Sequence, residues 1–295
     1  MTRSPGSPEV APAEGVLLID KPAGITSHDA VAMVRRALST KKVGHAGTLD
    51  PMATGLLLMG VGRATRLLRF LGDLPKTYEA TMRLGIETTT LDAEGEVVRI
   101  SPVDVSDEAL GAAVKALVGD SMQRPPAYSA VKVGGRKLYE AARKGEVLEA
   151  SARPIRVEAF DLLARRGADA DVRIVCSTGT YVRVLAADAG AALGCGAHLA
   201  RLRRTSIGPF EVGVAVRPDD PGAPLPLVCA VAHLPSWPVD AEEAVAVGHG
   251  RILAPAGIDG PFGVVGPDGR LLGVYEDDGT KSKPLMILAS VDGAS

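Results

Sequence analysis

The chain contains 295 residues, of which 46% are hydrophobic, 23% charged and 3% aromatic, and its formal net charge is −2. This composition excludes a disordered or collagen-like chain and predicts a globular protein of about two domains. No apolar run reaches the ~18 residues of a membrane span. Three scattered cysteines, Cys176, Cys195 and Cys229, exclude a disulfide framework and a cysteine-based zinc site.

The first 14 residues are rich in proline, serine and other small residues. They are predicted to form a disordered tail and not a signal peptide, because a signal peptide requires an apolar core that this segment lacks. Since the sequence shows no targeting or membrane segment, we expect a soluble cytoplasmic protein.

Hydrophobic periodicity predicts the elements that follow along the chain. Residues 15–20 predict a strand, which a turn at 21–24 closes. Ser27 is the expected N-cap of a helix that buries Val31 and Val34. The later predictions are a strand over 56–59, a basic helix over 64–71, a strand over 76–84, a helix over 107–119, a short helix near 138–143, strands over 155–163 and 172–176, a helix ending at Gly194 and a strand over 198–207.

The order of these elements predicts the fold class. Strands and helices follow one another irregularly, which favours an α+β fold with a mixed sheet over a regular βαβ array. Residues 15–217 are expected to form this main domain, and proline-rich residues 218–240 a linker. Residues 241–295 contain short strands broken by glycine and aspartate, and they predict a small, mostly β domain.

One loop combines glycines, polar groups and a single carboxylate. Residues 44–51 are Gly-His-Ala-Gly-Thr-Leu-Asp-Pro, and an apolar strand follows. Glycine permits positive φ, and Pro51 biases Asp50 toward an extended conformation that directs its side chain away from the scaffold. Asp50 is therefore either a turn cap or a reactive carboxylate. His45 lies in the same loop, but the other histidines show no ligand spacing, so no metal site is expected.

Arg183 follows a Thr-Gly-Thr turn and begins a helix that is otherwise apolar and rich in alanine. A guanidinium in such a pattern requires a carboxylate partner, because an unpaired buried charge is costly. Asp50 is a candidate partner, and the ion pair would keep Asp50 ionised and lower its pKa. The alternative is an ordinary surface arginine. Tyr78, within a strand, and Tyr181, beside Arg183, are interpreted first as core residues.

The charge is distributed unevenly along the chain. From residue 218 onward there are 11 acidic and 4 basic residues, whereas residues 121–160 contain eight basic and four acidic residues. A local excess of positive charge is typical of a protein that binds a phosphate backbone. A solvated surface explains such an excess equally well, so charge by itself leaves both interpretations open.

Several motifs occur together and in order between residues 18 and 210. They are Lys21-Pro22 with Gly24 and Ser27, Gly44-His45-Ala46-Gly47-Thr48-Leu49-Asp50-Pro51, Lys76-Thr77-Tyr78, Pro125-Pro126-Ala127-Tyr128-Ser129-Ala130-Val131-Lys132, Gly179-Thr180-Tyr181-Val182-Arg183 and Leu202-Arg203-Arg204-Thr205. Together these motifs resemble the TruB family of tRNA pseudouridine synthases. The resemblance implies the pseudouridine synthase fold, a mixed and largely antiparallel sheet with flanking helices, followed by a small β-rich PUA-like domain.

This resemblance implies an isomerase that converts uridine to pseudouridine in the tRNA T loop, at position 55, by flipping the base. Asp50 is then the nucleophile, Arg183 its ion-pair partner, and Tyr78 stacks on the uracil and takes part in proton removal. No metal or other cofactor is implied, because the reaction involves neither redox change nor group transfer. The residues implied to bind the substrate are His45, Tyr78, Tyr181, Leu202, Lys21 and Lys132.

The resemblance also implies partners and leaves alternatives. Residues 124–150 are similar to the family's RNA-gripping insertion, the expected partner is the tRNA T arm, and the protein is expected to act as a monomer. One alternative is a non-catalytic tRNA-binding or tRNA-folding protein on the same fold. Another is a small-molecule enzyme with an aspartate nucleophile, such as a phosphotransferase, which would leave the basic segment unexplained.

Overall fold

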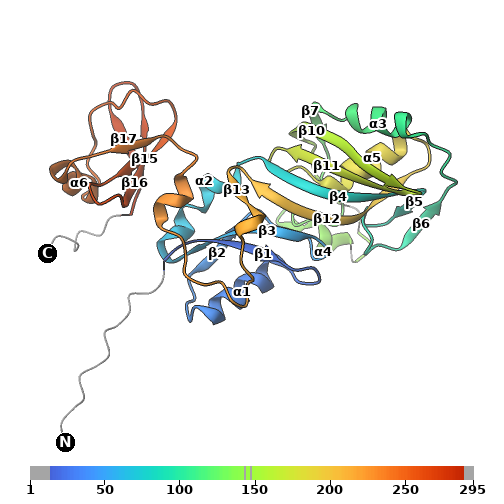
Figure 1. Ribbon diagram of the computed structural model, residues 1–295, viewed down its shortest axis with the longest axis horizontal. Helices are drawn as coiled ribbons and strands as arrows, with labels where there is room; N and C mark the ends of the chain where they lie inside the picture. Colours follow the sequence, from blue (N-terminus) through green and yellow to red (C-terminus); the bar gives the residue numbers. More distant parts are fainter. Residues whose placement is uncertain (1–13, 143, 147, 289–295) are drawn as a thin grey trace, which may run out of the picture.

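The computed structural model describes residues 14–142, 144–146 and 148–288. The predicted disordered tail lies outside the described residues, apart from Glu14. The described chain forms an elongated molecule, with a long curved sheet along most of its length and a smaller sheet at one end (Figure 1).

The large sheet contains the motif-bearing strands, and helices lie on its faces. Its strands are β1 (Gly15–Lys21), β2 (Val43–Ala46), β3 (Thr54–Val61), β4 (Lys76–Leu84), β7 (Gly119–Gln123), β10 (Arg153–Arg166), β11 (Asp169–Cys176), β12 (Ala197–Ile207) and β13 (Phe210–Glu211). Two small hairpins are β5 (Ile86–Thr88) with β6 (Val97–Ile100) and β8 (Lys132–Val133) with β9 (Arg136–Lys137). The α-helices are α1 (Ser27–Ala37), α2 (Leu68–Gly72), α3 (Asp107–Lys115), α4 (Leu138–Ala142), α5 (Val182–Ala192) and α6 (Ala241–Gly248).

The strand order of the large sheet is β1-β3-β12-β4-β11-β10-β7, with β2 paired to β3 and β13 to β12. The β3–β12 pairing is parallel, and the other pairings in this sheet are antiparallel. The predicted fold class, α+β with a mixed and largely antiparallel sheet, is therefore confirmed. The β12–β4 and β4–β11 pairings place the strand that carries Tyr78 at the centre of the sheet.

Strand β1 separates two apolar clusters because successive side chains point to opposite faces of a sheet. Leu17 and Ile19 pack in one cluster with residues of α1. Val16 and Leu18 pack in the other with residues of α2. Helices α1 and α2 therefore cover opposite faces of the β1–β3 end. At the other end, α3 and α5 pack against β10 and β12 over a third apolar cluster.

Helix α1 begins one residue earlier than its predicted cap indicates. Thr26, not Ser27, is the N-cap, and Thr26 and Asp29 form a reciprocal capping box. Asp29 supplies the acidic group at the third helical position, which the prediction from Ser27 overlooked. The Ser27 hydroxyl is therefore free to bond elsewhere, and it is 1% exposed.

Two other boundaries differ from the sequence-based prediction. The basic helix expected over 64–71 is two short pieces, the 3-10 helix η1 (Gly62–Arg66) and helix α2. The expected linker over 218–240 contains ordered elements, the 3-10 helix η3 (Leu227–Val231) and strand β14 (Ser236–Pro238). Strand β14 pairs in parallel with β15, so the C-terminal sheet starts before residue 241.

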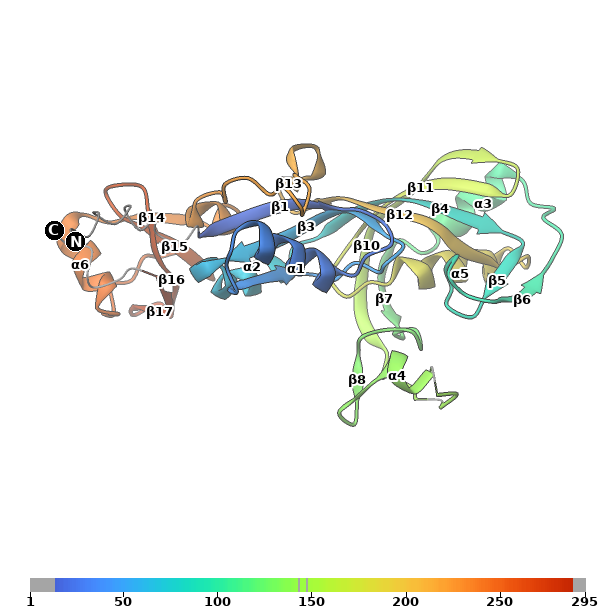
Figure 2. The same cartoon turned by 90° about the horizontal axis from the view of Figure 1, so that it is seen from below.

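The C-terminal sheet has the order β14-β15-β16-β17, where β15 is Pro261–Val265, β16 Leu271–Asp277 and β17 Ser282–Ile287. It packs against the main domain, because Leu271 and Met286 share an apolar cluster with Leu67 and Leu71 of the η1–α2 region. Figure 2 shows β8 and α4 projecting from the large sheet on the opposite side from β11. None of the described helices has the length and apolarity needed to cross a membrane.

Candidate active site

Residues 47–53, here called the Asp50 loop, connect β2 to β3, and other elements hold the loop backbone in place. The hydroxyl of Ser27 accepts a hydrogen bond from Leu49 N–H at 2.9 Å and donates one to the Leu49 carbonyl at 3.2 Å. Gly47 has a φ of 76°, in the left-handed region that favours glycine. Ala53 N–H donates to the Asp50 carbonyl at 3.1 Å and closes the turn.

Arg204 of β12 holds the start of the loop from inside the protein. Its side chain is 1% exposed. Its Nε donates to the Leu56 carbonyl at 2.7 Å, and its Nη2 donates to the Gly47 carbonyl at 3.0 Å. One buried guanidinium therefore connects the loop to the strand that follows it. Arg204 lies in one of the motifs quoted above, but its role could not be predicted from the sequence.

Lys21 holds the end of the loop. Its ammonium donates to the carbonyls of Pro22 at 2.9 Å, Ile25 at 2.8 Å and Pro51 at 3.3 Å. The residue is fully buried, and this burial lowers the pKa of Lys21 to about 8. The resemblance implies that Lys21 binds substrate. In the structure its ammonium donates to these backbone carbonyls, and the bond to Pro51 holds the backbone next to Asp50 in place.

Asp50 and Arg183 come together as the sequence predicts. Arg183 Nε lies 3.1 Å from Asp50 Oδ2, and Nη1 lies 3.4 Å from Asp92 Oδ2. The Nε–H is not aligned for a hydrogen bond with any described residue, so its contact with Asp50 is ionic. Nη1 donates to the Thr90 carbonyl at 3.1 Å and Nη2 to the Tyr128 carbonyl at 2.9 Å. The Arg183 and Asp92 side chains are 4% exposed, whereas Asp50 is 38% exposed.

The pKa of Asp50 corrects one expectation. We predicted that the arginine would lower it, but burial of the carboxylate raises the pKa of Asp50 above its ordinary value. The charge of Arg183 acts in the opposite direction, and the nearby charge of Asp92 raises the pKa further. The surrounding protein removes water from the Asp50 carboxylate, and the charge of Asp92 offsets part of the lowering by Arg183, so the pKa of Asp50 is raised.

Asp92 is a site residue that sequence analysis missed. Its carboxylate accepts hydrogen bonds from the Thr90 hydroxyl and, at 3.1 Å, from Glu94 N–H. The preceding Leu91 has a φ of 64°, an uncommon conformation for a bulky residue, and Leu199 N–H donates to its carbonyl at 3.0 Å. This strained turn holds Asp92 against β12. Only an aspartate in a polar turn was visible in the sequence, and that pattern is too common to indicate a site.

Tyr78 and Leu202 lie in the same apolar cluster as Leu49 of the Asp50 loop. They are 8% and 9% exposed, so both are almost fully buried in this structure. Burial raises the pKa of Tyr78, and the facing guanidinium of Arg204 opposes that shift. A raised pKa keeps the Tyr78 hydroxyl protonated near neutral pH.

Tyr181 is the N-cap of α5, two residues before Arg183. Gln123 of β7 binds its backbone at both ends: Tyr181 N–H donates to Oε1 at 2.7 Å, and Nε2 donates to the Tyr181 carbonyl at 3.2 Å. Gln123 is 5% exposed. The Gln123 side-chain amide therefore bonds the Tyr181 backbone as a neighbouring strand would. These bonds fix the position of Tyr181, where α5 begins. Gln123 carries no signal in the sequence that would predict this role.

Replacing Gln123 with alanine is expected to destabilise the protein by about 1–3 kcal/mol, because it leaves the Tyr181 N–H without its partner. The Tyr181 carbonyl still accepts from Val184 N–H and Leu185 N–H. Urea unfolding measures this change. Hydrogen exchange at the Tyr181 amide should accelerate in Gln123→Ala and remain slower in Gln123→Glu, which keeps the acceptor. Equal exchange in both variants and the wild type would contradict the assigned contact.

His45 lies on β2 and is partly buried. Its ring contacts His28 edge-on, with ring centroids 5.4 Å apart, and its Nδ1 is buried without a hydrogen-bond partner among the described residues. Burial and the nearby His28 lower the pKa of His45, which keeps the ring neutral. A neutral ring beside the Asp50 loop is suited to contact with an uncharged base.

Lys132 is exposed on β8, in the β8–β9 hairpin of the insertion, and is not one of the residues that contact Asp50. The insertion carries less free positive charge than its sequence indicates, because several of its cations form ion pairs with nearby acidic residues. These pairs are Arg124–Glu149 at 2.5 Å, Lys137–Glu140 at 3.5 Å, and Arg136–Glu146.

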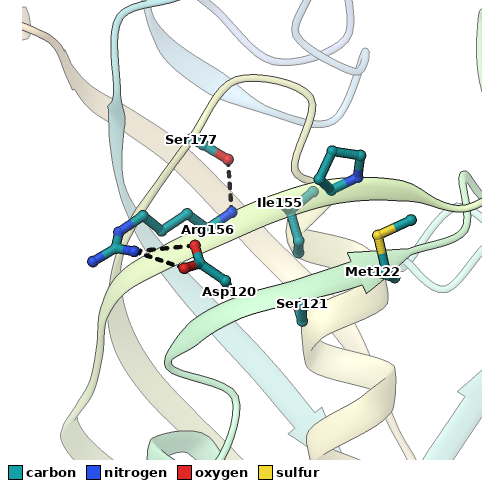
Figure 3. A pocket seen from close by; sticks show the side chains of 7 residues that line it. Asp120, Ser121, Met122, Ile155, Arg156 and Ser177 are labelled. Atoms are coloured by element: carbon teal, nitrogen blue, oxygen red, sulfur yellow. Dashed lines mark hydrogen bonds and ion pairs between the residues drawn. The ribbon is translucent and has the colours of Figure 1, made fainter.

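A surface pocket lies at the β7–β10 edge, away from Asp50. Figure 3 shows Arg156 in its wall, where the guanidinium pairs with both oxygens of Asp120 and the backbone N–H donates to Ser177 Oγ at 2.9 Å. Ser177 begins the loop that leads to Tyr181. The pocket therefore borders the loop that precedes α5, and the chemistry at Asp50 lies outside it.

Comparison with known families and proteins agrees with this geometry. The family model for the N-terminal domain of the TruB family pseudouridylate synthases matches residues 35–182. The model for the C-terminal domain of tRNA pseudouridylate synthase B matches residues 183–220, and the C-terminal model of tRNA pseudouridine synthase II matches residues 234–289. These matches cover the C-terminal sheet and all strands of the large sheet after β1.

Individual relatives are similar over nearly their whole length. A tRNA pseudouridine synthase B of Thermobifida fusca is 49% identical over 94% of this chain and 99% of that protein. One of Nocardia farcinica is 46% identical over 97% of each. Among solved structures, an H/ACA RNP bound to a substrate RNA containing 2′-deoxyuridine has a chain with a TM-score of 0.73 and 26% identity, covering 94% of this chain and 86% of that one. A chain of a Cbf5-Nop10-Gar1 complex has the same TM-score and coverage at 28% identity.

The family models, the near-complete coverage of the relatives and the shared fold agree, and the chain belongs to the TruB family of pseudouridylate synthases.

Proposed function

We propose that the protein isomerises uridine to pseudouridine in the T loop of tRNA, at position 55, with Asp50 as the nucleophile. The observation that carries the proposal is the contact between Arg183 and Asp50, at 3.1 Å, in a chain that matches this family over most of its length. The relatives are named tRNA pseudouridine synthase B, which supports tRNA as the substrate. The intact ion pair disfavours a purely tRNA-binding role.

The reaction breaks the C1′–N1 bond, turns the uracil and forms a C1′–C5 bond, after which C5 loses its proton to solvent and N1 carries one. An ionised Asp50 can attack C1′ or remove the 2′ proton, and either step divides the reaction into easier ones. Arg183 orients the carboxylate, and the fixed loop backbone holds it still while the base turns. The reaction as written requires no electron acceptor and no transferred group.

The uridine must leave the RNA stack to reach Asp50, at a cost of a few kcal/mol. We assign Tyr78 to stacking on the flipped uracil, and Leu202 and Tyr181 to the walls around the nucleotide. His45 supports the RNA beside the vacated position. Lys132 and the rest of the insertion over 124–150 contact the RNA backbone.

The domain assignment is part of the same proposal. Residues 15–217 form the catalytic domain, and the C-terminal sheet with α6 forms a PUA-like domain. We expect the enzyme to act in the cytoplasm as a monomer.

The proposal is tested by tritium release from a T-arm stem-loop that carries uridine labelled with tritium at C5. The wild-type enzyme is expected to release one tritium for each uridine converted, because C5 loses its hydrogen when it bonds to C1′. A stem-loop with cytidine at the target position is the matched control. Binding without release from the uridine substrate would support the tRNA-binding alternative.

Activity is expected to fall on acidification with an apparent pKa above the ordinary range of an aspartate. Asp50 must be ionised to act, and burial raises its pKa, so protonation begins at a higher pH than for an exposed carboxylate. The measurement is kcat/KM for the stem-loop across the acidic range, with stem-loop affinity as the control. An acid limb at or below the ordinary aspartate value would contradict the assignment.

A further inference from the structure

The large sheet consists of two halves that meet at one short pairing. Strands β1, β2 and β3 form the first half, and β12 with β13, β4, β11, β10 and β7 form the second (Figure 1). Strand β1 pairs with β3 along its whole length, whereas β3 pairs with β12 over Thr54–Arg203 and Gly55–Arg204. The two halves also pack largely in separate apolar clusters. Backbone pairing by itself therefore does little to fix the geometry of this junction.

The proposed chemistry needs side chains from both halves. Asp50 lies in the loop between β2 and β3, in the first half. Arg183, which contacts Asp50 and Asp92, lies on α5, and α5 packs on β12 in the second half. Leu199 N–H of β12 donates to the carbonyl of Leu91, next to Asp92. A shift at the junction would therefore move Asp50 relative to the groups that surround its carboxylate.

One ion pair crosses this junction. Arg203 of β12 donates from Nη1 to Asp20 Oδ1 at 3.0 Å and from Nη2 to Asp20 Oδ2 at 2.7 Å. Asp20 belongs to β1, so the contact spans β3, and the backbones that it joins are about 10 Å apart at the usual strand spacing. Two parallel bonds from a planar guanidinium fix orientation as well as distance. The two side chains are 39% and 33% exposed, so the pair contributes geometry more than stability.

The residues next to this ion pair hold the two ends of the Asp50 loop. On β1, Lys21 directly follows the aspartate and bonds the end of the loop. On β12, Arg204 directly follows the arginine and bonds the start of the loop. Successive side chains of a strand point to opposite faces, so one face of β1 and β12 carries these buried loop contacts and the other carries the ion pair. The ion pair therefore fixes the spacing of the two strands that hold the loop.

Resting on the proposed function, we infer that Asp20 and Arg203 are positioning residues: their ion pair sets the spacing of β1 and β12 and thereby places Asp50 against Arg183. In this role neither side chain touches the uridine, and both act through the backbone of the Asp50 loop. Loss of the pair should slow the chemical step, because a displacement of about 1 Å at a reacting group can cost up to about a hundredfold in rate.

The test begins with Asp20→Asn, which keeps the shape of the side chain but places an amide NH₂ where the guanidinium requires an acceptor. The single-turnover rate of tritium release is expected to fall about tenfold, while stem-loop affinity stays within roughly twofold. Glu79 of β4 pairs in register with Arg203, and its charge also acts on the guanidinium, so the fold should persist.

Variants of the arginine test whether the two residues act as a unit. Arg203→Lys keeps the charge but not the planar fork, so its rate should lie between those of the wild type and Arg203→Gln. The double variant Asp20→Asn/Arg203→Gln should be no slower than the slower single variant, because both changes remove the same contact. Fully additive losses would overturn the inference.

The matched control is Asp169→Asn, which breaks a similar pair inside the second half. Both oxygens of Asp169 accept from Arg83 on the neighbouring strand β4, and the two side chains are also partly exposed. This variant should change the thermal midpoint about as much as Asp20→Asn does, but it should leave the rate of tritium release unchanged. Equal slowing in both variants would overturn the inference, because general destabilisation would then explain the effect.

Hydrogen exchange gives a result that does not depend on activity. Leu49 N–H in the Asp50 loop donates to the Ser27 hydroxyl, and its exchange should accelerate in Asp20→Asn but not in Asp169→Asn. Faster exchange with no tritium release by the wild type supports the positioning role and rejects the isomerase. Unchanged exchange and rate in Asp20→Asn, with an active wild type, overturn the inference and leave the function standing. Weaker stem-loop binding at an unchanged single-turnover rate also overturns it, because the pair would then contact the RNA directly.

Discussion

Replacing Asp50 with asparagine is expected to lower the rate of tritium release by at least about three orders of magnitude, while stem-loop affinity stays within roughly threefold. Asparagine has nearly the same shape but cannot act as an anionic nucleophile, so the loss falls on chemistry and not on binding. The Asp50 loop should keep its conformation, because Ser27, Arg204 and Lys21 bond its backbone and not the carboxylate.

The same variant gives a second, independent result. Burial raises the pKa of Asp50 in the folded protein, so the folded state binds a proton more readily than the unfolded chain does. The stability associated with Asp50 is therefore greatest at low pH and decreases as pH rises through the interval between the two pKa values. Asp50→Asn removes this cost at neutral pH, and its thermal midpoint should be equal to or above that of the wild type. A lower midpoint together with lost binding would indicate misfolding.

Replacing Arg183 with methionine is expected to destabilise the protein by about 3–5 kcal/mol at neutral pH, because it removes the cation that contacts both Asp50 and Asp92. The two carboxylates would then repel each other, and one of them, Asp92, is buried. The loss is measured by urea unfolding, and activity should fall as far as in Asp50→Asn.

The double variant Asp50→Asn/Arg183→Met is the matched control. Of the two carboxylates that face each other in Arg183→Met, the double variant keeps only Asp92. It should therefore regain part of the stability that Arg183→Met loses. Acidification should also restore part of it, because the carboxylates become neutral. Arg183→Lys keeps a charge but not the planar fork that reaches Asp50, Asp92 and Tyr128, so it should fold better than Arg183→Met and still react slowly. Equal stability of all these variants would contradict the network.

The pairing of Asp50 with Arg183 could be expected from the sequence for a general reason. An arginine in an otherwise apolar helix needs a carboxylate, and Asp50 is a carboxylate in a constrained loop. The sign of the pKa shift could not be obtained in the same way. It depends on Asp92 and on how much water the folded protein removes, and neither is encoded near Asp50 in the chain.

Lys21 and Arg204 show the other limit of sequence analysis. Both occur in motifs that indicate the family, but a motif does not say which way a side chain points. The structure turns both cations inward onto backbone carbonyls of the Asp50 loop. The basic insertion is similar, since its charge was visible in sequence but its ion pairs were not.

The sequence by itself determined the family, the α+β fold class and the identity of the central pair, because these depend on local periodicity and on motifs within short segments. The tertiary structure alone decided which polar groups surround that pair. Asp92, Gln123 and Arg204 reach the site from distant parts of the chain, through a strained turn, a strand end and a central strand. Such contacts form because buried polar groups must find partners when the sheet closes, and that requirement acts across the whole fold.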